Sequence, residues 1–302
     1  MMRLSSSLSY EKAVEISCDL SMLPSMSRAG LERLTQRYAS ACQTQTRELL
    51  EVAKDAPLLA GQGRQMVIEV DGVRVLGQAQ DGVCGGIEIK SAVIHPVAAP
   101  QQRSILADVC EATAFTDQIA GLMREAGLRT QDEVVGLSDG ATWIKHLYEN
   151  LGVEHIIDVY HSSSYLDTVM ETLGWDEDGR TQTRRAWVTG NIKAAEWLQE
   201  HSPDVDVWRS WNEPTQTAWH YLEERQHHMD YPSYKDRGLP IGSGQVEGVN
   251  KSVIGFRMKQ SGMQWSRSGA GRMASLRARR CSKRPLVSHD TLRHHAFPCP
   301  TG

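Results

Sequence analysis

The feature that most constrains the fold is a change of hydrophobic period at residue 64, where helical spacing gives way to short β-branched runs. The sequence predicts strands at 65–71, 73–79 and 86–95, the first two joined by the turn pair Asp71-Gly72. A helix is expected from about 104 to 127, then a strand at 133–139, a helix at 143–150, a strand at 155–161 and a further helix. This β-β-β-α-β-α-β-α order predicts a mixed sheet with helices on its faces.

The segments on either side of this pattern are predicted to be helical. Residues 1–63 contain two amphipathic pieces separated near Pro24, with Ser27 as the expected N-cap of the second. Such a pair can form a DNA-binding helix-turn-helix, or it can serve only packing or dimerisation. Residues 174–237 carry six tryptophans and little strand character, which predicts an all-helical insertion.

The charge of the chain is unevenly distributed. Its 302 residues have a formal net charge of −4, yet residues 251–302 carry eleven Lys or Arg against the single acid Asp290. Residues 1–250 therefore carry −14. The basic C-terminal part is either a solvated helix face or a nucleic-acid contact surface, since Lys and Arg contacts to phosphates release condensed counterions.

The cysteines and the apolar runs exclude several protein classes. No Cys-x-x-Cys and no paired Cys/His spacing occurs, which argues against a zinc ribbon and a disulfide scaffold. No apolar run approaches the roughly 20 residues that a membrane helix needs. We therefore expect a cytoplasmic protein with no membrane partner. The cysteines are Cys18, Cys42, Cys84, Cys110, Cys281 and Cys299.

Three acids occupy informative positions in the predicted order. Asp71 ends the first predicted strand, Asp139 ends the fourth, and Glu247 begins a predicted helix after the turn at 242–244. Side chains at the ends of neighbouring strands can converge at one edge of a sheet. Carboxylates suit Mg²⁺ or Mn²⁺, and two such ions can drive an in-line phosphoryl displacement. Each Asp-Gly pair alone is more often a turn, but the set of three favours a metal site.

A series of motifs runs through the chain from about residue 64 to 280. The motifs are Asp71-Gly72, Ser138-Asp-Gly-Ala-Thr-Trp-Ile144, Asp158-Val-Tyr-His161, Gly242-Ser-Gly-Gln-Val-Glu247 through Lys251, and Arg257-Met-Lys-Gln-Ser-Gly-Met-Gln-Trp-Ser-Arg-Ser-Gly-Ala270 with Leu276-Arg277. In this order they resemble the ISKra-type DDE transposases of bacterial insertion sequences, within the mutator-like group. The most specific of them is the final block, 257–270.

The resemblance implies a ribonuclease H-like core interrupted by a helical insertion. Asp71, Asp139 and Glu247 match the three acids that bind two Mg²⁺ or Mn²⁺ ions. Asp158 and His161 match an Asp-x-x-His signature, in which His161 either lies near the scissile phosphate or caps the strand end and orients Asp158. The implied activity is cleavage at transposon ends and joining of the 3′-hydroxyl to target DNA, by a homo-oligomer on double-stranded DNA.

The implied domains are a core at 64–173, the insertion at 174–237, a catalytic helix with a basic DNA-contacting segment at 238–280, and a tail at 281–302. Trp265 could stack on an unpaired base or anchor its segment against the core. After His161 the chain reads Ser-Ser-Ser-Tyr-Leu, where the family usually has Ala and a His-Leu pair. The expected DNA contacts are Lys251, Arg257, Lys259, Trp265, Arg267 and Arg272.

Two alternatives remain open from the sequence. One is an inactive, truncated transposase remnant that binds DNA without cutting it. The other is a nuclease of the same fold, which hydrolyses strands without joining them.

Overall fold

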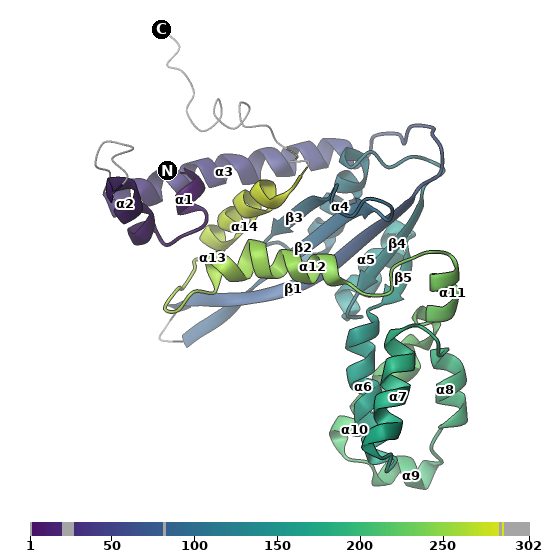
Figure 1. The fold of residues 1–302 in the computed structure, drawn as a ribbon. Helices are drawn as coiled ribbons and strands as arrows, with labels where there is room; N and C mark the ends of the chain where they lie inside the picture. The colour runs from purple at the N-terminus through teal and green to yellow at the C-terminus, as the bar shows by residue number, and fades with distance from the viewer. Residues whose placement is uncertain (1, 20–26, 81–82, 284–285, 287–302) are drawn as a thin grey trace. The chain divides into compact units, whose positions relative to one another are not determined.

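The computed structural model describes residues 2–19, 27–80, 83–283 and 286. The protein is mixed α/β, with a five-stranded mixed sheet and helices (Figure 1). The chain divides into two compact units, a first unit of residues 1–133 with 245–302 and a second unit of residues 134–244. None of the helices in the described residues combines the length and the apolar content that a membrane crossing needs.

The strands of the first unit form an antiparallel meander. They are β1 (Gln65–Gln80), β2 (Val83–Pro96) and β3 (Ser104–Asp108), and β2 pairs with both others. The predicted turn at Asp71-Gly72 is wrong, because β1 continues through it and Asp71 pairs with Ser91 of β2. Apolar residues alternate on both sides of Asp71-Gly72, and β2 pairs with β1 along most of its length. These two features outweigh the turn preference of one dipeptide.

The third strand also differs from the prediction. The helix expected from residue 104 begins later, as α4 (Ala112–Glu125), and residues 104–108 are β3, all five buried. The two strands predicted at 65–71 and 73–79 are one strand, and the missing third strand lies at the start of the predicted helix. The β-β-β-α order therefore holds with different residues.

Helices of the first unit pack on the meander and on one another. They are α1 (Met2–Ser5), α2 (Tyr10–Asp19), α3 (Arg28–Ala53), α4, α12 (Gly244–Val249), the π-helix η2 (Asn250–Gly255), α13 (Phe256–Met258) and α14 (Arg267–Cys281). Ser27 caps α3 as predicted, since its hydroxyl accepts the Gly30 N–H. The link between α2 and α3 lies outside the described residues, so the helix-turn-helix stays a prediction.

Close helix packing in this unit depends on a glycine. A Cβ at Gly121 of α4 would lie 2.2 Å from the Leu50 carbonyl oxygen of α3, so another residue would force the two helices apart. The main core lies between the strands and the α12–α14 segment, where Ile89, Val93 and Ile105 belong to one buried cluster with Val253 and Met273. Burial of this apolar surface is the main force that holds the segment in place.

The second unit joins parallel strands to helices. Its strands β4 (Glu133–Ser138) and β5 (Glu154–Ile157) pair in parallel. Residues 174–237 contain helices and no strand. The helices of this unit are α5 (Thr142–Leu151), α6 (Val159–Thr172), α7 (Glu177–Val188), α8 (Ala194–Glu200), α9 (Val205–Ser210), α10 (Glu213–Arg225), the 3₁₀ helix η1 (Gln226–His228) and α11 (Tyr231–Asp236).

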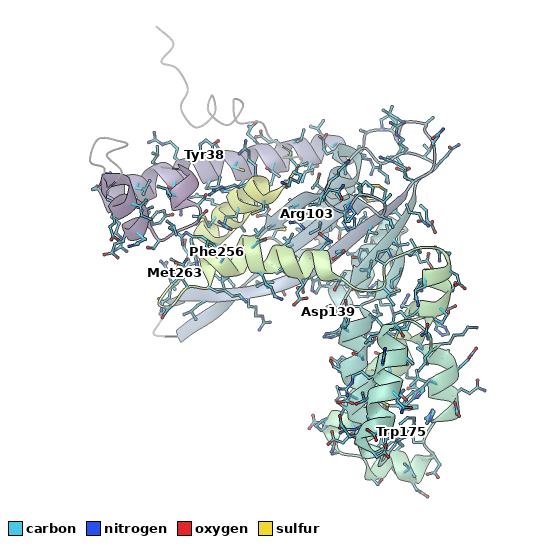
Figure 2. The ribbon with its side chains drawn as sticks, viewed as in Figure 1. Tyr38, Arg103, Asp139, Trp175, Phe256 and Met263 are labelled. Atoms are coloured by element: carbon cyan, nitrogen blue, oxygen red, sulfur yellow. The ribbon has the colours of Figure 1, made fainter. Side chains whose placement is uncertain are left out.

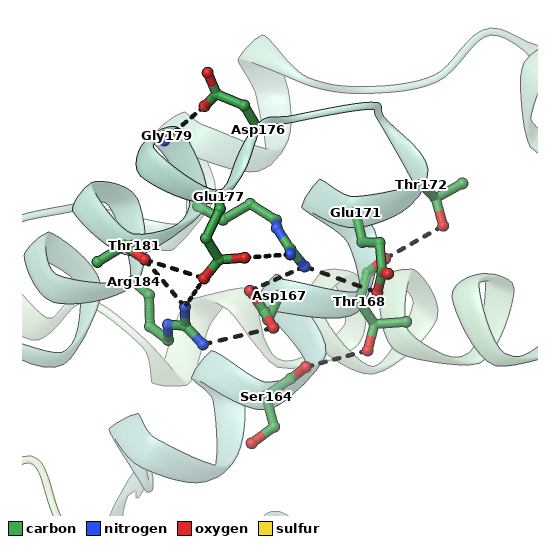
Figure 3. Close-up of polar contacts among 11 residues, drawn as sticks. Ser164, Asp167, Thr168, Glu171, Thr172, Asp176, Glu177, Gly179, Thr181 and Arg184 are labelled. Carbon is green, nitrogen blue, oxygen red and sulfur yellow. Dashed lines mark hydrogen bonds and ion pairs between the residues drawn. The ribbon is translucent and has the colours of Figure 1, made fainter.

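Aromatic packing and surface ion pairs hold these helices together. Trp187 is fully buried, and its indole donates to the Ser162 hydroxyl at 2.9 Å. Trp197, Trp211 and Trp219 are buried as well, so these tryptophans form much of the core between the helices. Ion pairs from Asp167 and Glu171 of α6 to Arg180 and Arg184 of α7 link the two helices, and Glu177 pairs with both arginines within α7 (Figure 3). Exposed pairs of this kind each add about 1 kcal/mol or less.

Candidate functional site

Asp71 is held in place by a residue from the C-terminal helices. Its Oδ2 accepts a hydrogen bond from Asn250 Nδ2 at 2.5 Å, and its Oδ1 accepts the Gly72 N–H at 2.6 Å. Ser91 Oγ, from β2, donates to Asn250 Oδ1 at 2.6 Å and so fixes the orientation of that amide. The carboxylate is thereby tied to the helical segment that contains Glu247.

Glu247 lies in α12, three residues before Asn250. Its side chain is 68% exposed and pairs with Lys251, one turn further on, at 2.7 Å. Residues three apart lie on adjacent turns of the same helix face. Glu247 and Asn250, the residue that holds Asp71, thus lie on adjacent turns of this segment in the first unit. An ion pair this exposed contributes little and leaves Glu247 available to another cation.

A buried carboxylate fixes the start of α12. Glu69 is 2% exposed, and its Oε2 accepts the Val246 N–H at 2.8 Å, which satisfies one of the first-turn donors of the helix. Its Oε1 lies 3.4 Å from His95 Nε2. Glu69 was not predicted from the sequence, although residues two apart in a strand lie on the same face and Glu69 precedes Asp71 by two.

The π-helix that follows α12 was also missed. In η2 the Phe256 N–H donates to the Lys251 carbonyl, five residues back. The carbonyls of Ser252 and Val253 in this turn accept hydrogen bonds from the buried Arg277 guanidinium. Single π-helical turns often mark functional sites, and this one begins at Asn250.

Asp139 directly follows β4 in the second unit (Figure 2). Its Oδ1 accepts the Ala141 N–H at 3.0 Å, and its carbonyl accepts the Tyr221 hydroxyl at 2.6 Å. Gly140 has a φ of +82°, and a Cβ there would lie 2.9 Å from both Arg225 and Ile157. Only glycine fits this turn, which sets the direction of the Asp139 side chain.

Below this turn lies a buried serine–histidine contact. The Ser138 hydroxyl accepts the Gly140 N–H and lies 2.8 Å from His155 Nε2. Burial, with smaller contributions from His228 and Arg225, lowers the pKa of His155 to about 3. His155 is therefore neutral in the folded protein at neutral pH.

This burial predicts a pH-dependent stability. The unfolded His155 protonates near its ordinary pKa of 6.5 and the folded one only near 3, so protons favour the unfolded state between these values. As the pH falls from 6.5 towards 4, the free energy of unfolding should fall by about 1 kcal/mol per unit more than in His155→Gln. Urea denaturation at several pH values measures this. Equal slopes in the two proteins would show that His155 makes no such contribution.

Asp158 of the predicted signature has two structural tasks. It caps α6, since its Oδ1 accepts the His161 N–H at 2.7 Å. Its Oδ2 accepts both the N–H and the hydroxyl of Ser243, at 2.6 and 2.8 Å. Asp158 therefore fixes the glycine-rich turn that precedes α12 in the chain.

The His161 side chain packs against aromatic residues. Its ring lies edge-on to Tyr165 and Tyr221, with centroids 5.4 and 5.8 Å away, and these tyrosines stack on each other at 3.9 Å. Burial raises the pKa of Tyr221. These contacts favour the structural alternative for His161, whose catalytic role stays a prediction.

Two of the six expected DNA contacts are buried. Arg257 is 1% exposed, its Nε donates to the Ser5 carbonyl, and its guanidinium lies over the rings of Tyr10 and Trp265. Burial lowers the pKa of Arg257. Trp265 is 7% exposed, its indole donates to the Met258 carbonyl, and its backbone pairs with Leu76 and Gln78 beside the bulge in β1. The structure favours a packing role for Arg257 and the anchoring role for Trp265.

The other four expected contacts are more accessible. Lys251 and Lys259 are exposed, and Arg272 is partly buried. Arg267 is 64% exposed and pairs with the exposed Glu111 at 3.3 Å. Their contact with DNA stays a prediction, and their exposure leaves them accessible to it.

The predicted metal ligands belong to different units, Asp71 and Glu247 to the first and Asp139 to the second. Among the described residues, no group of three or more His, Cys, Asp or Glu is placed to hold a metal ion. The carboxylates themselves are hard oxygen donors of the kind that Mg²⁺ and Mn²⁺ prefer. The metal site stays a prediction.

Two comparisons with known proteins found no match. No protein-family model matches the chain, and no curated protein matches it.

Proposed function

We propose that this protein is a DDE transposase of an insertion sequence, which cleaves DNA at the element's ends and joins the freed 3′-hydroxyl to target DNA. Asp71, Asp139 and Glu247 would bind two Mg²⁺ or Mn²⁺ ions, as the motif resemblance implies. Such ions activate the attacking oxygen and stabilise the leaving one. The protein would act as a homo-oligomer on double-stranded DNA, because two ends must be paired.

The observation that carries this proposal is the Asp71–Asn250–Ser91 hydrogen-bond chain. The Asn250 amide donates to the Asp71 carboxylate at 2.5 Å, and the Ser91 hydroxyl donates to the Asn250 amide oxygen at 2.6 Å. Asn250 follows Glu247 by three residues in the same helical segment. Buried polar groups that orient a partly exposed carboxylate are typical of sites in which that carboxylate must point in one direction to bind a metal ion. A carboxylate with only a surface role would not need this support.

The surroundings of Glu247 suit a polyanionic substrate. Lys251 pairs with Glu247 in the free protein and lies one helical turn away. Binding of a cation by Glu247 would release the Lys251 ammonium for a nearby phosphate. The Glu247 carboxylate would then face the metal ion and the Lys251 ammonium would face the phosphodiester, so both charges of the complex would be matched.

A variant of Asn250 tests this proposal. Replacing Asn250 by alanine removes the donor to Asp71 Oδ2 while keeping all three acids. We expect Mn²⁺-dependent cleavage of DNA that carries the element's ends to slow by about 10- to 100-fold, with saturation at higher Mn²⁺ concentration. Asn191→Ala, in the second unit, is the matched control, since Asn191 contacts Thr189 and Lys235 at the surface.

Rescue by excess Mn²⁺ would show that Asn250 acts through metal binding at Asp71. Unchanged rate and Mn²⁺ dependence in Asn250→Ala would contradict the assignment of Asp71 as a metal ligand.

A further inference from the structure

Along the α3 helix, the first unit contains an open groove of about 460 Å³, lined by α3 and by Arg272 of α14. The groove is outside the predicted metal site, and five of the six residues that form its polar lining were not expected to contact DNA. These six are Gln36, Arg37, Ser40, Thr44, Gln45 and Arg272.

The chemistry of this lining is that of a phosphate-binding surface. Arg37 and Arg272 supply two guanidinium groups, and Ser40 and Thr44 supply hydroxyls. Among the described residues, no Asp or Glu lines the groove itself, and the neighbouring Glu48 carboxylate accepts a hydrogen bond from the Gln45 amide at 2.8 Å. Arg, Ser and Thr are among the side chains that contact DNA phosphates. A polyanion gains from the two cations.

Helical spacing gives this lining an extended shape. Arg37, Ser40 and Thr44 lie three and four residues apart, so they share one face of α3. From residue 36 to 45 this face runs about 14 Å, at about 1.5 Å per residue. Phosphates follow each other at about 3.4 Å of rise along one strand of a duplex, so about four of them fit this length.

A further arginine extends the basic surface along α14. Arg279 follows Arg272 by seven residues, which places both on one helix face about 10 Å apart along the axis. The positive charge of Arg279 acts on Tyr38 and Cys42, two buried residues of α3, so Arg279 lies on the α3 side of α14 (Tyr38 is labelled in Figure 2).

The two walls of the groove are fixed relative to each other. Leu276 of α14 packs on Tyr38, Ala39 and Cys42 of α3. A Cβ at Gly271, next to Arg272, would lie 2.7 Å from the Gln43 amide nitrogen of α3, which shows how closely the helices approach. Cationic groups on rigid elements bind a ligand with a smaller entropic cost than groups on a loop.

We infer that this α3–α14 groove binds the sugar–phosphate backbone of duplex DNA. The inference rests on the proposed function, because that function makes DNA the partner. It adds a DNA-contact surface that involves α3. An acidic protein segment would also match the two arginines, but the Ser40 and Thr44 hydroxyls beside them favour phosphates.

Salt-dependent DNA binding tests the inference without any catalysis. Fluorescence anisotropy of a short labelled duplex of arbitrary sequence would be measured in EDTA over a range of salt concentrations. The test variant is Arg37→Gln with Arg272→Gln. The control is Arg185→Gln with Arg209→Gln, which removes the same charge from two exposed positions of the second unit, on α7 and α9.

We expect the test variant to bind the duplex at least about tenfold more weakly at low salt. Its slope of log K against log salt should become less steep by the amount that corresponds to about two phosphate contacts. The control should keep the wild-type slope. Equal losses in both double variants, or wild-type binding by the test variant, would overturn the inference. So would a test variant that loses binding to an acidic peptide while it keeps the slope for DNA.

The two proposals fail in different ways. If the protein binds this duplex through the groove but gives no metal-dependent product, DNA binding by the groove is supported and the transposase proposal is contradicted. If joined products form while the test variant keeps the wild-type salt slope, the transposase proposal is supported and DNA binding by the groove is contradicted.

Discussion

Replacing Asp139 by asparagine should reduce metal-dependent DNA cleavage by about a thousandfold or more, and Asp71→Asn and Glu247→Gln should do the same. Each change removes one negative charge from a predicted metal ligand but keeps the side-chain size. Metal ions supply several kcal/mol of transition-state stabilisation, and about 1.4 kcal/mol corresponds to each factor of ten in rate. Cleavage rates with saturating Mn²⁺ and DNA measure the effect.

The control for these variants is an acid outside the predicted site. Glu111 is 85% exposed and forms a surface ion pair with the exposed Arg267, so Glu111→Gln should leave the cleavage rate within about twofold. A variant of Asp71, Asp139 or Glu247 that cleaves as fast as Glu111→Gln would remove that residue from the metal site. DNA binding in EDTA should persist in all four variants.

Replacing Asp108 by alanine should lower the free energy of unfolding by about 3 kcal/mol, which would be the largest loss of stability expected here. Asp108 ends β3, is 2% exposed, and accepts hydrogen bonds from Arg47, Gln43 and Gln118 at 2.7 to 3.1 Å. Removing the buried carboxylate takes the acceptor from the partly buried Gln43 and Gln118 amides and the charge partner from Arg47, which is 46% exposed. Urea denaturation followed by circular dichroism gives the value.

Asp117→Ala provides the comparison. This carboxylate is 60% exposed and lies 3.6 Å from Lys54, so its loss should change the free energy of unfolding by about 0.5 kcal/mol or less. A similar small change in Asp108→Ala would mean that the network contributes little. Burial also raises the pKa of the neighbouring Cys110 to about 11, with Asp108 as the second cause, so that thiol stays protonated at neutral pH.

The order of strands and helices could be predicted from the sequence because hydrophobic period distinguishes helix from strand. The boundaries could not. The three apolar residues of β3, Ile105-Leu-Ala107, have the same pattern as about one turn of buried helix, so β3 was assigned to the helix that follows it. At Asp71-Gly72 the dipeptide indicated a turn, but pairing with β2 over the whole of the 16-residue β1 decides the backbone there.

The support of the candidate site could not be predicted, because its partners are distant in the chain. Asn250 reaches Asp71 across 179 residues, and Glu69 reaches Val246 across 177. Local pattern identifies acids that follow strands but not the amide that orients them. Exposure was misjudged for the same reason. Arg257 was expected to contact DNA and Arg277 was counted in the basic segment, whereas their guanidinium groups are buried and donate to the Ser5 and Ser6 carbonyls.

The most direct test of the proposed transposase is to follow the fate of the 3′-hydroxyl. Wild-type protein would be incubated with Mn²⁺, labelled DNA that carries the flanking ends of its element, and an unlabelled target. The proposal predicts a labelled strand covalently joined to target DNA, absent with Asp139→Asn and Glu247→Gln. Nicked DNA without joined product would indicate a nuclease, and DNA binding without any metal-dependent product would indicate an inactive remnant; either result would contradict the proposed function.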